Sequence, residues 1–559
     1  MIKDQVLVKQ MLEMINTSIE ASEYLYESFK NYNYSSFIQV SNDISDVINT
    51  IHNVILNIKK QENLTINVDL ACENASYSLS RIKNLFKSRS KKTLDKIEFE
   101  LIPILEVMYL QLYFWGSVYP DKKRIHEYYD NELISLCHNK YIDEAEKSGV
   151  YKYDLSIIVI GYNKLEYTKL CIENLLKYIP DNINYELILV NHGSIDNTKE
   201  YFEHISPTKQ LDILKNGGSP SLPSRIVEGK YTLTISNDVI VTENAIENMI
   251  KCIESDDNIA WVVPSTPNMC NNQTIPANYN TIEEMHEFSR LNNVSNPYRW
   301  EQRVRLCNPI DLKRSSMWYS SNGIGWGGYF HTPNAMVAPD EKVSLILRRK
   351  GYKLMLAKDA YCYHFGGVTR KDEIKNHKDK HGNVGAEAFY KEAREDFIDI
   401  FGIDPLSIGV EYDPILFNNL ECNDNGHVDI LGINCGIGST PLKIKESIKE
   451  NAHNLDVSIY NVVDEVRYID DLKNTSEIVD YISDFEKLDN IFDSKKFNYI
   501  VFESKFDTCK NPVKIINILK NKLVENGILI IRTINSRLEK EFKNMDVEFL
   551  KIGNWIILK

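Results

Sequence analysis

The chain has 559 residues, of which 43% are hydrophobic and 26% are charged, and its formal net charge is −14. This length exceeds the size at which one hydrophobic core keeps growing, so we expect two to four domains in a soluble, globular protein. The acidic balance, with acids and bases interspersed, argues against binding to nucleic acid or to an anionic membrane surface.

The cysteines and the first residues indicate the compartment. Ten cysteines are scattered without a CxxC pair, which argues against a disulfide framework or a structural zinc site and favours a reducing cytoplasm. The start, MIKDQVLVKQ, lacks the apolar core of a secretory signal. No apolar run approaches the ~20 residues that span a bilayer. We therefore expect a cytoplasmic protein with no membrane span, and the sequence leaves its oligomeric state open.

Residues 1–148 are predicted to form a helical domain. Apolar residues recur there at spacings of three and four, as in Ile51, Ile55 and Ile58. No glycine precedes Gly116, so the turns rely on Asn, Ser and Asp. We expect four or five helices packed as a bundle, whose role is docking to a partner or to the next domain.

Residues 149–382 are predicted to form a multilayer α/β domain. Short apolar strands alternate with helices such as 165–179 and 243–254, a rhythm typical of a mainly parallel sheet covered on both faces. The stretch from about 268 to 335 is irregular and rich in Asn, Ser, Tyr, Trp and Gly. Long irregular segments of this kind in an enzyme domain are typical of substrate loops.

A helical linker is predicted at 383–425, and a second α/β domain at 426–559. The runs HVDILGINCGIG, VSIYNVVDE, FNYIVFES and GILIIRTIN repeat the alternating rhythm. The closing runs DVEFLKIG and NWIILK predict antiparallel strands at the end of this domain.

Three apolar runs of the central domain end in polar or glycine residues. Ligands bind at the carboxyl ends of strands in an open α/β sheet, so we expect these residues to converge on one cleft. A diphosphate bound there needs a divalent cation, for which Asp238 supplies a carboxylate. The other strand-end residues are Gly161, Tyr162 and Asn163 after the first run, Asn191, Gly193, Ser194 and Asp196 after the second, and Ser236 and Asn237 after the third.

Residues 154–370 resemble the family 2 nucleotide-sugar glycosyltransferases of the GT-A fold. SIIVIGYN matches the opening strand that holds the nucleoside, and NHGSIDNT matches the acidic-x-glycine-serine-x-aspartate loop. SND takes the place of the metal-binding DxD motif, and PDEKVSLILRRKGYKLMLAKDAYCYHFGG resembles the acidic pair, the helix and the closing strand with a histidine. The resemblance implies a GT-A α/β/α sandwich, a nucleotide-sugar donor, and Asp238 and His364 as ligands of Mn²⁺ or Mg²⁺.

The resemblance also implies a catalytic base. An inverting transfer needs a carboxylate that takes the proton of the acceptor hydroxyl, at a typical gain of about 10²–10⁴-fold. The register of the following helix favours Asp340, and Glu341 is the alternative because Pro339 stands where the first acid often lies. An Asp before a helical run is also a favoured N-cap, so a capping role for Asp340 stays open.

One residue of the proposed site departs from the family pattern, and one loop is a candidate acceptor site. Asn191 stands where the family usually has Asp, and its amide oxygen can still accept from uracil N3–H without charge assistance. The loop GIGWGGYF is predicted to be an acceptor platform, in which Trp326 stacks on a sugar or peptide and Gly327 and Gly328 allow close backbone approach. An ordinary glycine-rich turn with a core Trp is the alternative.

Residues 426–559 resemble a Rossmann-like methyltransferase that uses S-adenosylmethionine. LGINCGIG takes the place of the glycine-rich loop, but Asn434 replaces the first loop glycine. Val463 stands where the ribose-binding acid is expected, and Asp464 comes one position later. S-adenosylmethionine is therefore a doubtful ligand, and we expect a fold kept for docking, dimerisation or acceptor presentation.

The sequence as a whole predicts a metal-dependent inverting glycosyltransferase. The expected donor is a UDP-sugar, with UDP-N-acetylglucosamine as the first candidate. The domain plan is similar to that of bacterial flagellin glycosyltransferases, which implies a Ser or Thr hydroxyl of a protein acceptor such as flagellin. Three alternatives stay open: a glycosyltransferase for polysaccharide or lipid-linked glycan, a bifunctional glycosyltransferase and methyltransferase, and a non-catalytic binding or scaffold protein.

Overall fold

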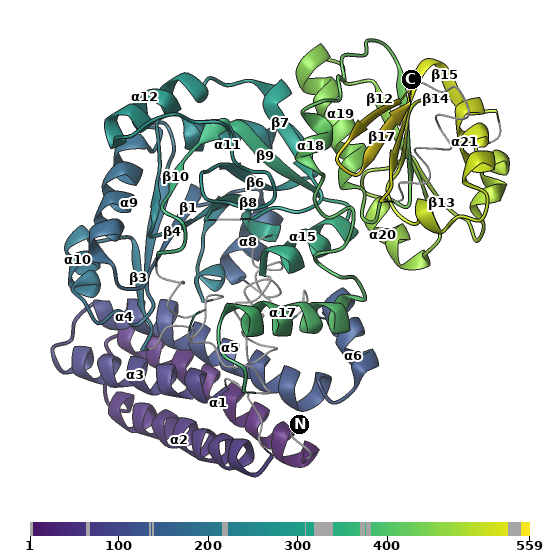
Figure 1. Ribbon diagram of the computed structural model, residues 1–559. Helices are drawn as coiled ribbons and strands as arrows, with labels where there is room; N and C mark the ends of the chain where they lie inside the picture. The colour runs from purple at the N-terminus through teal and green to yellow at the C-terminus, as the bar shows by residue number, and fades with distance from the viewer. Residues whose placement is uncertain are drawn as a thin grey trace.

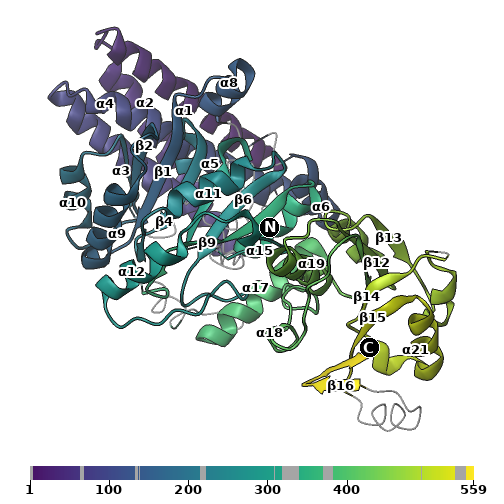
Figure 2. The same ribbon diagram turned by 90° about the horizontal axis from the view of Figure 1, so that it is seen from above.

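A computed structural model describes residues 4–62, 68–132, 139–214, 222–307, 309–317, 339–368, 382–492, 494–534 and 549–558, together with positions 136 and 375. The chain forms a helical part, then a part built on an eight-stranded sheet, then a part built on a seven-stranded sheet. Figure 1 shows the helical part below the eight-stranded sheet and the seven-stranded sheet at the upper right. Figure 2 shows the same arrangement from above.

The helical part is held together by long amphipathic helices that pack side by side. Ile15 and Ile55 are fully buried, as the spacing of apolar residues predicts. A Cβ at Gly116 would lie 2.5 Å from Val8, so the absence of a side chain lets two helical segments approach closely. The helices are α1 (Gln5–Lys30), α2 (Phe37–Glu62), α3 (Val68–Lys87), α4 (Lys92–Lys96), α5 (Ile102–Tyr113), α6 (Lys122–Glu127) and α8 (Lys140–Ser148), with π-helical segments at Ile97–Leu101, Phe114–Val118 and Tyr128–Glu132.

The expectation that no run is long and apolar enough to span a bilayer needs correction. Within the described residues, the helical stretch Lys92–Val118 meets both criteria. However, 72% of its most apolar window is buried inside the protein, and α5 within it packs against α1 and α3. Such burial is typical of the core helix of a soluble domain.

The eight-stranded sheet has the order β3-β2-β1-β4-β8-β6-β9-β7. β7 and β8 run antiparallel to their neighbours, and the other pairs are parallel, so the mainly parallel sheet expected from the sequence is confirmed. A short antiparallel pair, β5 (Val239–Ile240) with β10 (Tyr363–His364), lies beside it. The strands are β1 (Tyr153–Gly161), β2 (Tyr185–Asn191), β3 (Lys209–Asp212), β4 (Gly229–Ser236), β6 (Ile259–Ser265), β7 (Trp300–Arg303), β8 (Ile310–Arg314) and β9 (Lys353–Tyr361).

Both faces of this sheet are covered. Leu155 and Ile157 of β1 pack in one core with α9 and α11, whereas Ile158, on the opposite face, packs in the same apolar cluster as the N-terminal helices. The helical part therefore forms the layer that covers one face of the sheet (Figure 1). The helices of this part are α9 (Leu165–Tyr178), α10 (Thr198–Ile205), α11 (Ala245–Glu254), α12 (Ile282–Asn292) and α15 (Pro339–Arg349), with 3₁₀ turns at Pro223–Arg225 and Pro297–Arg299.

Buried charges join the helical part to the end of β3. Asp212 is 1% exposed, and it accepts from Arg81 at 2.6 Å and from Lys96 at 3.3 Å. Glu100 binds the same two cations. Burial would raise the pKa of Asp212, but the charges of Lys96 and Arg81 lower it to about 2. This network fixes β3 against α3 and α4.

The seven-stranded sheet has the order β13-β12-β11-β14-β15-β17-β16, and β17 runs antiparallel to both neighbours. The antiparallel ending expected for this region is thus confirmed. The connecting segment contains α17 (Ala386–Phe401) and α18 (Pro414–Phe417). The elements of the sheet are β11 (Val428–Ile433), α19 (Ser439–Ala452), β12 (Val457–Val463), α20 (Ile469–Leu472), β13 (Ile478–Tyr481), β14 (Phe497–Phe502), α21 (Pro512–Asn521), β15 (Leu523–Arg532), β16 (Phe549–Ile552) and β17 (Trp555–Leu558), with 3₁₀ turns at Val466–Tyr468, Phe485–Asn490 and Phe506–Thr508.

The C-terminal part docks on α15 through a buried ion-pair cluster. Asp471 has a fully buried side chain and accepts from Arg348 and Arg349 of α15, each at 3.1 Å. On β7, Glu301 is bound by Lys443 of α19 at 2.9 Å. The orientation of the two sheets therefore depends on paired charges that each part supplies.

Candidate functional site

Three strand ends of the central sheet are joined by hydrogen bonds between their loops. The backbone N–H of Asn163 donates to Ser194 Oγ at 2.9 Å, and Asn163 Oδ1 accepts from the N–H of Ile195 at 2.8 Å. The N–H of Leu165 donates to Asp196 at 3.1 Å. These contacts bring the end of β1, at Gly161, and the following residue Tyr162 against the loop after β2 that contains Gly193.

The third strand end is attached to the same network. Asn237 Nδ2 donates to the carbonyl of Asn163 at 3.2 Å and to Thr168 Oγ1 at 2.9 Å. Ser236 ends β4 beside Ile160 of β1. The structure therefore brings together the strand-end residues at which the sequence predicts nucleotide binding.

Asn191 lies inside this edge of the sheet. It is 4% exposed, and its amide oxygen accepts from the N–H of Ser194 at 3.0 Å. Its amide nitrogen faces Asp212 Oδ1 at 3.5 Å. Asn191 thus connects the loop after β2 with the charge network that binds the helical part. The sequence carries no signal for that network, because Arg81 and Asp212 are 131 positions apart and lie in different domains.

Asp238 and His364 meet where β5 pairs with β10. His364 lies opposite Val239, and its Nε2 is 3.4 Å from Asp238 Oδ2. The same carboxylate oxygen accepts from the backbone N–H of Val368 at 3.2 Å. Burial would raise the pKa of Asp238, but the hydrogen bond and charge of His364 and the N–H of Val368 hold it below its usual value. Asp238 is therefore a carboxylate at neutral pH.

The pair fits a divalent cation. Bonds of about 2.1 Å to a shared cation bring two ligand atoms within about 3–3.4 Å of each other. The distance between Asp238 Oδ2 and His364 Nε2 has this size, and Nε2 also accepts from the backbone N–H of Gly367 at 3.4 Å. In the part of the chain that the structure describes, no group of three or more His, Cys, Asp or Glu residues gathers to hold a metal. A cation here would therefore take its remaining ligands from a bound ligand and water.

Asp340 lies in the first turn of α15. A tight turn at Gly351 connects α15 to β9, so the N-terminus of α15 points toward the carboxyl end of β9. That strand end continues directly into β10 and His364.

Glu341 is engaged elsewhere. Its carboxylate pairs with Arg305 at 2.5 Å, and Arg305 also pairs with Glu411 of the connecting segment at 2.7 Å. Glu341 is thus part of an ion-pair network around Arg305, and the assignment of the base to Asp340 stays a prediction. The expected acceptor platform, with Trp326, Gly327 and Gly328, lies outside the described residues.

The glycine-rich loop of the C-terminal sheet is covered by the connecting segment. A Cβ at Gly409 would lie 1.9 Å from the carbonyl oxygen of Cys435, and a Cβ at Gly436 would lie 1.8 Å from that of Ile408. The first backbone N–H of α19, at Ser439, donates to the carbonyl of Gly409 at 3.0 Å. The protein's own backbone therefore occupies the position where a cofactor would meet the loop and the helix N-terminus.

Polar groups next to this loop are paired with each other. Asn434 adopts φ 49° and donates to Asp464 at 3.0 Å, and Lys505 binds Asp464 at 2.8 Å. Beneath the loop, burial raises the pKa of Glu503 to about 7. Asp464, which lies one position after the place where the ribose-binding acid is expected, is thus neutralised by Lys505.

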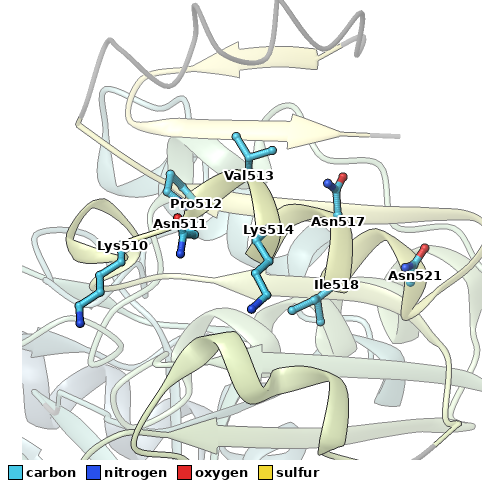
Figure 3. A pocket seen from close by; sticks show the side chains of 8 residues that line it. All are labelled: Lys510, Asn511, Pro512, Val513, Lys514, Asn517, Ile518 and Asn521. Carbon is cyan, nitrogen blue, oxygen red and sulfur yellow. The ribbon is translucent and has the colours of Figure 1, made fainter.

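A hollow of about 740 Å³ lies elsewhere on the C-terminal part, along α21. Figure 3 shows that its lining side chains come from α21 and the two residues before it. Lys514 at this surface pairs with Glu486 at 2.9 Å. The hollow belongs to a different sheet from Asp238 and His364, so it is not part of the candidate site.

Comparison with known proteins finds a family match within the central domain. Residues 156–300 match the family described as Glycosyl transferase family 2, and residues 6–111 match a Domain of unknown function (DUF8042). Glycosyltransferase GlyG of Streptococcus pneumoniae serotype 4 (strain ATCC BAA-334 / TIGR4) is 30% identical over 110 residues, which cover 18% of this chain and 36% of that protein. The chain thus spans about a third of the length of this curated relative.

Two solved structures are similar at low identity. One is GalNAc-T7 with UDP, GalNAc and Mn²⁺, at 11% identity and a TM-score of 0.30, covering 38% of this chain and 44% of that one. The other is the mannosyltransferase PcManGT from Pyrobaculum calidifontis in complex with GDP-Man and Mn²⁺, at 13% identity and a TM-score of 0.28, covering 46% and 67%. TM-scores of this size carry no argument about the present chain.

Proposed function

We propose that this protein is a metal-dependent inverting glycosyltransferase that transfers N-acetylglucosamine from UDP-N-acetylglucosamine to a Ser or Thr hydroxyl of a protein, with flagellin as the first candidate acceptor. The observation that carries the proposal is the convergence of Asp238 and His364 beside three joined strand ends, within and next to the matched segment. We also propose a cytoplasmic location, in keeping with the scattered, unpaired cysteines of the described residues.

Asp238 and His364 would hold the cation, Mn²⁺ or Mg²⁺. When bound, the cation neutralises charge on the nucleoside diphosphate that leaves. The loops that contain Asn163, Asn191 and Asn237 would hold the nucleoside, because their amides and backbone groups are already fixed in place by hydrogen bonds.

Asp340 would act as the base. Its carboxylate takes the proton of the acceptor hydroxyl while the acceptor oxygen forms a bond to the anomeric carbon. The bond from that carbon to the diphosphate oxygen breaks, UDP departs, and the configuration at the anomeric carbon is inverted. Glu341 serves instead to fix the first turn of α15 through Arg305.

The proposal is tested with purified protein, UDP-N-acetylglucosamine, Mn²⁺ and unglycosylated flagellin. We expect a mass increase of one N-acetylhexosamine on flagellin, which the Asp340→Ala variant does not produce. NMR of the product gives the anomeric configuration, and retention of configuration would overturn the inverting mechanism. Release of UDP without any change in flagellin would instead indicate a glycan or lipid-linked acceptor.

We further propose that the C-terminal part is a docking domain that does not bind S-adenosylmethionine. The contacts of Ile408 and Gly409 with the glycine-rich loop support this role. Titration calorimetry of the full chain with S-adenosylmethionine should give no binding heat. A saturable heat, together with methyl transfer to the acceptor, would favour the bifunctional alternative.

A further inference from the structure

Two cysteines face each other beside the first turn of α15. Cys270 lies in the loop after β6 and Cys307 lies between β7 and β8, and their sulfur atoms are 3.2 Å apart. Cys270 is exposed, whereas Cys307 is 2% exposed. A disulfide bond has a sulfur–sulfur distance of about 2.05 Å, so closure needs a movement of only about 1 Å.

The backbone around the two cysteines is fixed on both sides. Gln273 bonds Cys307 twice, because its side chain accepts from the N–H at 2.7 Å and donates to the carbonyl at 2.8 Å. Asn271 donates to the carbonyl of Arg305 at 2.5 Å. These hydrogen bonds tie the loop of Cys270 to the segment of Cys307, which keeps the two sulfur atoms opposite each other.

The surroundings favour a thiolate at Cys270. The hydrogen bond from Cys307 and the guanidinium of Arg305, 3.9 Å away, lower the pKa of Cys270 to about 7 against the opposing effect of burial. The other cysteines that the structure describes all have raised pKa values. Cys270 is thus the best nucleophile among them and is also open to solvent.

We propose that Cys270 and Cys307 form a redox-sensitive dithiol that is oxidised to a disulfide by small-molecule disulfides. The Cys270 thiolate attacks one sulfur of the oxidant and releases one thiolate, which leaves a mixed disulfide on Cys270. Cys307 then loses its proton to solvent and attacks Cys270 Sγ, which releases the second thiolate. Two protein thiols are oxidised, and one small-molecule disulfide is reduced to two thiols.

Arg305 links the cysteine pair to the turn that carries the candidate base. Arg305 contacts Cys270 on one side and holds Glu341 on the other, and Glu341 is the neighbour of Asp340 in the chain. Oxidation removes the negative charge of Cys270 from Arg305 and moves Cys270 toward Cys307. The position of the first turn of α15 therefore depends on the oxidation state. This effect on sugar transfer rests on the proposed function, whereas disulfide formation does not.

The test treats the full chain with oxidised glutathione, blocks the remaining thiols, and maps disulfide-linked peptides by mass spectrometry. We expect one linked pair of peptides that contain Cys270 and Cys307, reversed by dithiothreitol. Cys270→Ser should abolish this pair. Cys509→Ser, at a half-buried cysteine of the C-terminal part, should leave it intact. A glutathione adduct that persists on Cys270, no modification of Cys270, or a link from Cys270 to a different cysteine would each overturn the dithiol.

Activity is then compared between the oxidised and reduced protein. We expect the oxidised protein to differ from the reduced protein at least about threefold in UDP release. Cys270→Ser should remove that sensitivity. If the linked peptides form and UDP release is unchanged, the regulatory role is wrong although the dithiol is real. If no sugar donor is turned over in either state, the proposed function fails and the peptide result stands by itself.

Discussion

Replacing Gly409 by Ala tests whether the connecting segment truly occupies the glycine-rich loop of the C-terminal sheet. Gly409 has φ +83°, and a Cβ there would lie 1.9 Å from the carbonyl oxygen of Cys435. A left-handed conformation costs a residue with a side chain about 1–2 kcal/mol. The clash is with backbone, which cannot rotate away, so overpacking adds about 1–3 kcal/mol. We expect a total loss of about 2–5 kcal/mol in the stability of this contact.

A second glycine of the same segment gives the matched control. Gly402 also has a positive φ, +70°, but no described atom lies within 4 Å of the position of its Cβ. Gly402→Ala should therefore show only the conformational cost. The assay is hydrogen exchange of the full chain, read at the N–H of Ser439, which donates to Gly409. We expect that N–H to lose protection in Gly409→Ala and to keep it in Gly402→Ala. Equal protection in the two variants would refute the occupied loop.

Three further outcomes follow from buried charges. Asp471→Ala leaves Arg348 buried without its partner, so denaturant titration should show a loss of about 3–5 kcal/mol, whereas Asp470→Ala, at an exposed neighbour, should change stability by less than about 0.5 kcal/mol. Because the folded pKa of Glu503 is raised to about 7, its contribution to stability is full below about pH 4.5 and is lost as the pH rises through about 7. Glu503→Gln should therefore stabilise the protein by up to roughly 3 kcal/mol at about pH 8 and change its stability little at about pH 4. Equal effects at both pH values would contradict this expectation. Arg81→Gln should raise the KM for the sugar donor about tenfold with little change in kcat, because Arg81 fixes Asp212 beside Asn191. The control Glu106→Gln breaks a different contact between the same two domains and should leave KM within about twofold.

The order of elements and the strand-end residues could be predicted because both depend on local sequence. Buried parallel strands are continuous apolar runs, and the groups at their carboxyl ends follow directly in the chain, as Asn163, Asn191 and Asn237 do. The joint assignment of Asp238 and His364 came instead from a family resemblance, and the pairing of β5 with β10 that brings them together is seen only in the structure. Their spacing of more than 100 positions has no periodic signal in one sequence.

What could not be predicted depends on contacts between distant parts of the chain. The Asp212 network uses cations from two helices of another domain, and the ion pair of Glu341 depends on Arg305 from a different segment. In the sequence, Asn434 in place of the first loop glycine already argued against S-adenosylmethionine as a ligand of the C-terminal domain. The backbone of Gly409 over the loop, however, is a property of packing. A hydrophobic pattern specifies which face is buried and does not specify what covers it.

The central claim is that Asp238 and His364 form the cation site of a sugar-nucleotide enzyme. The most direct measurement is UDP release from UDP-N-acetylglucosamine, with and without Mn²⁺, by the wild type, by Asp238→Asn and by Asp256→Asn, a matched variant at a surface ion pair of the same domain. We predict that release by the wild type and by Asp256→Asn requires Mn²⁺, and that Asp238→Asn lowers it at least about 100-fold. Undiminished, Mn²⁺-dependent release by Asp238→Asn would contradict the account.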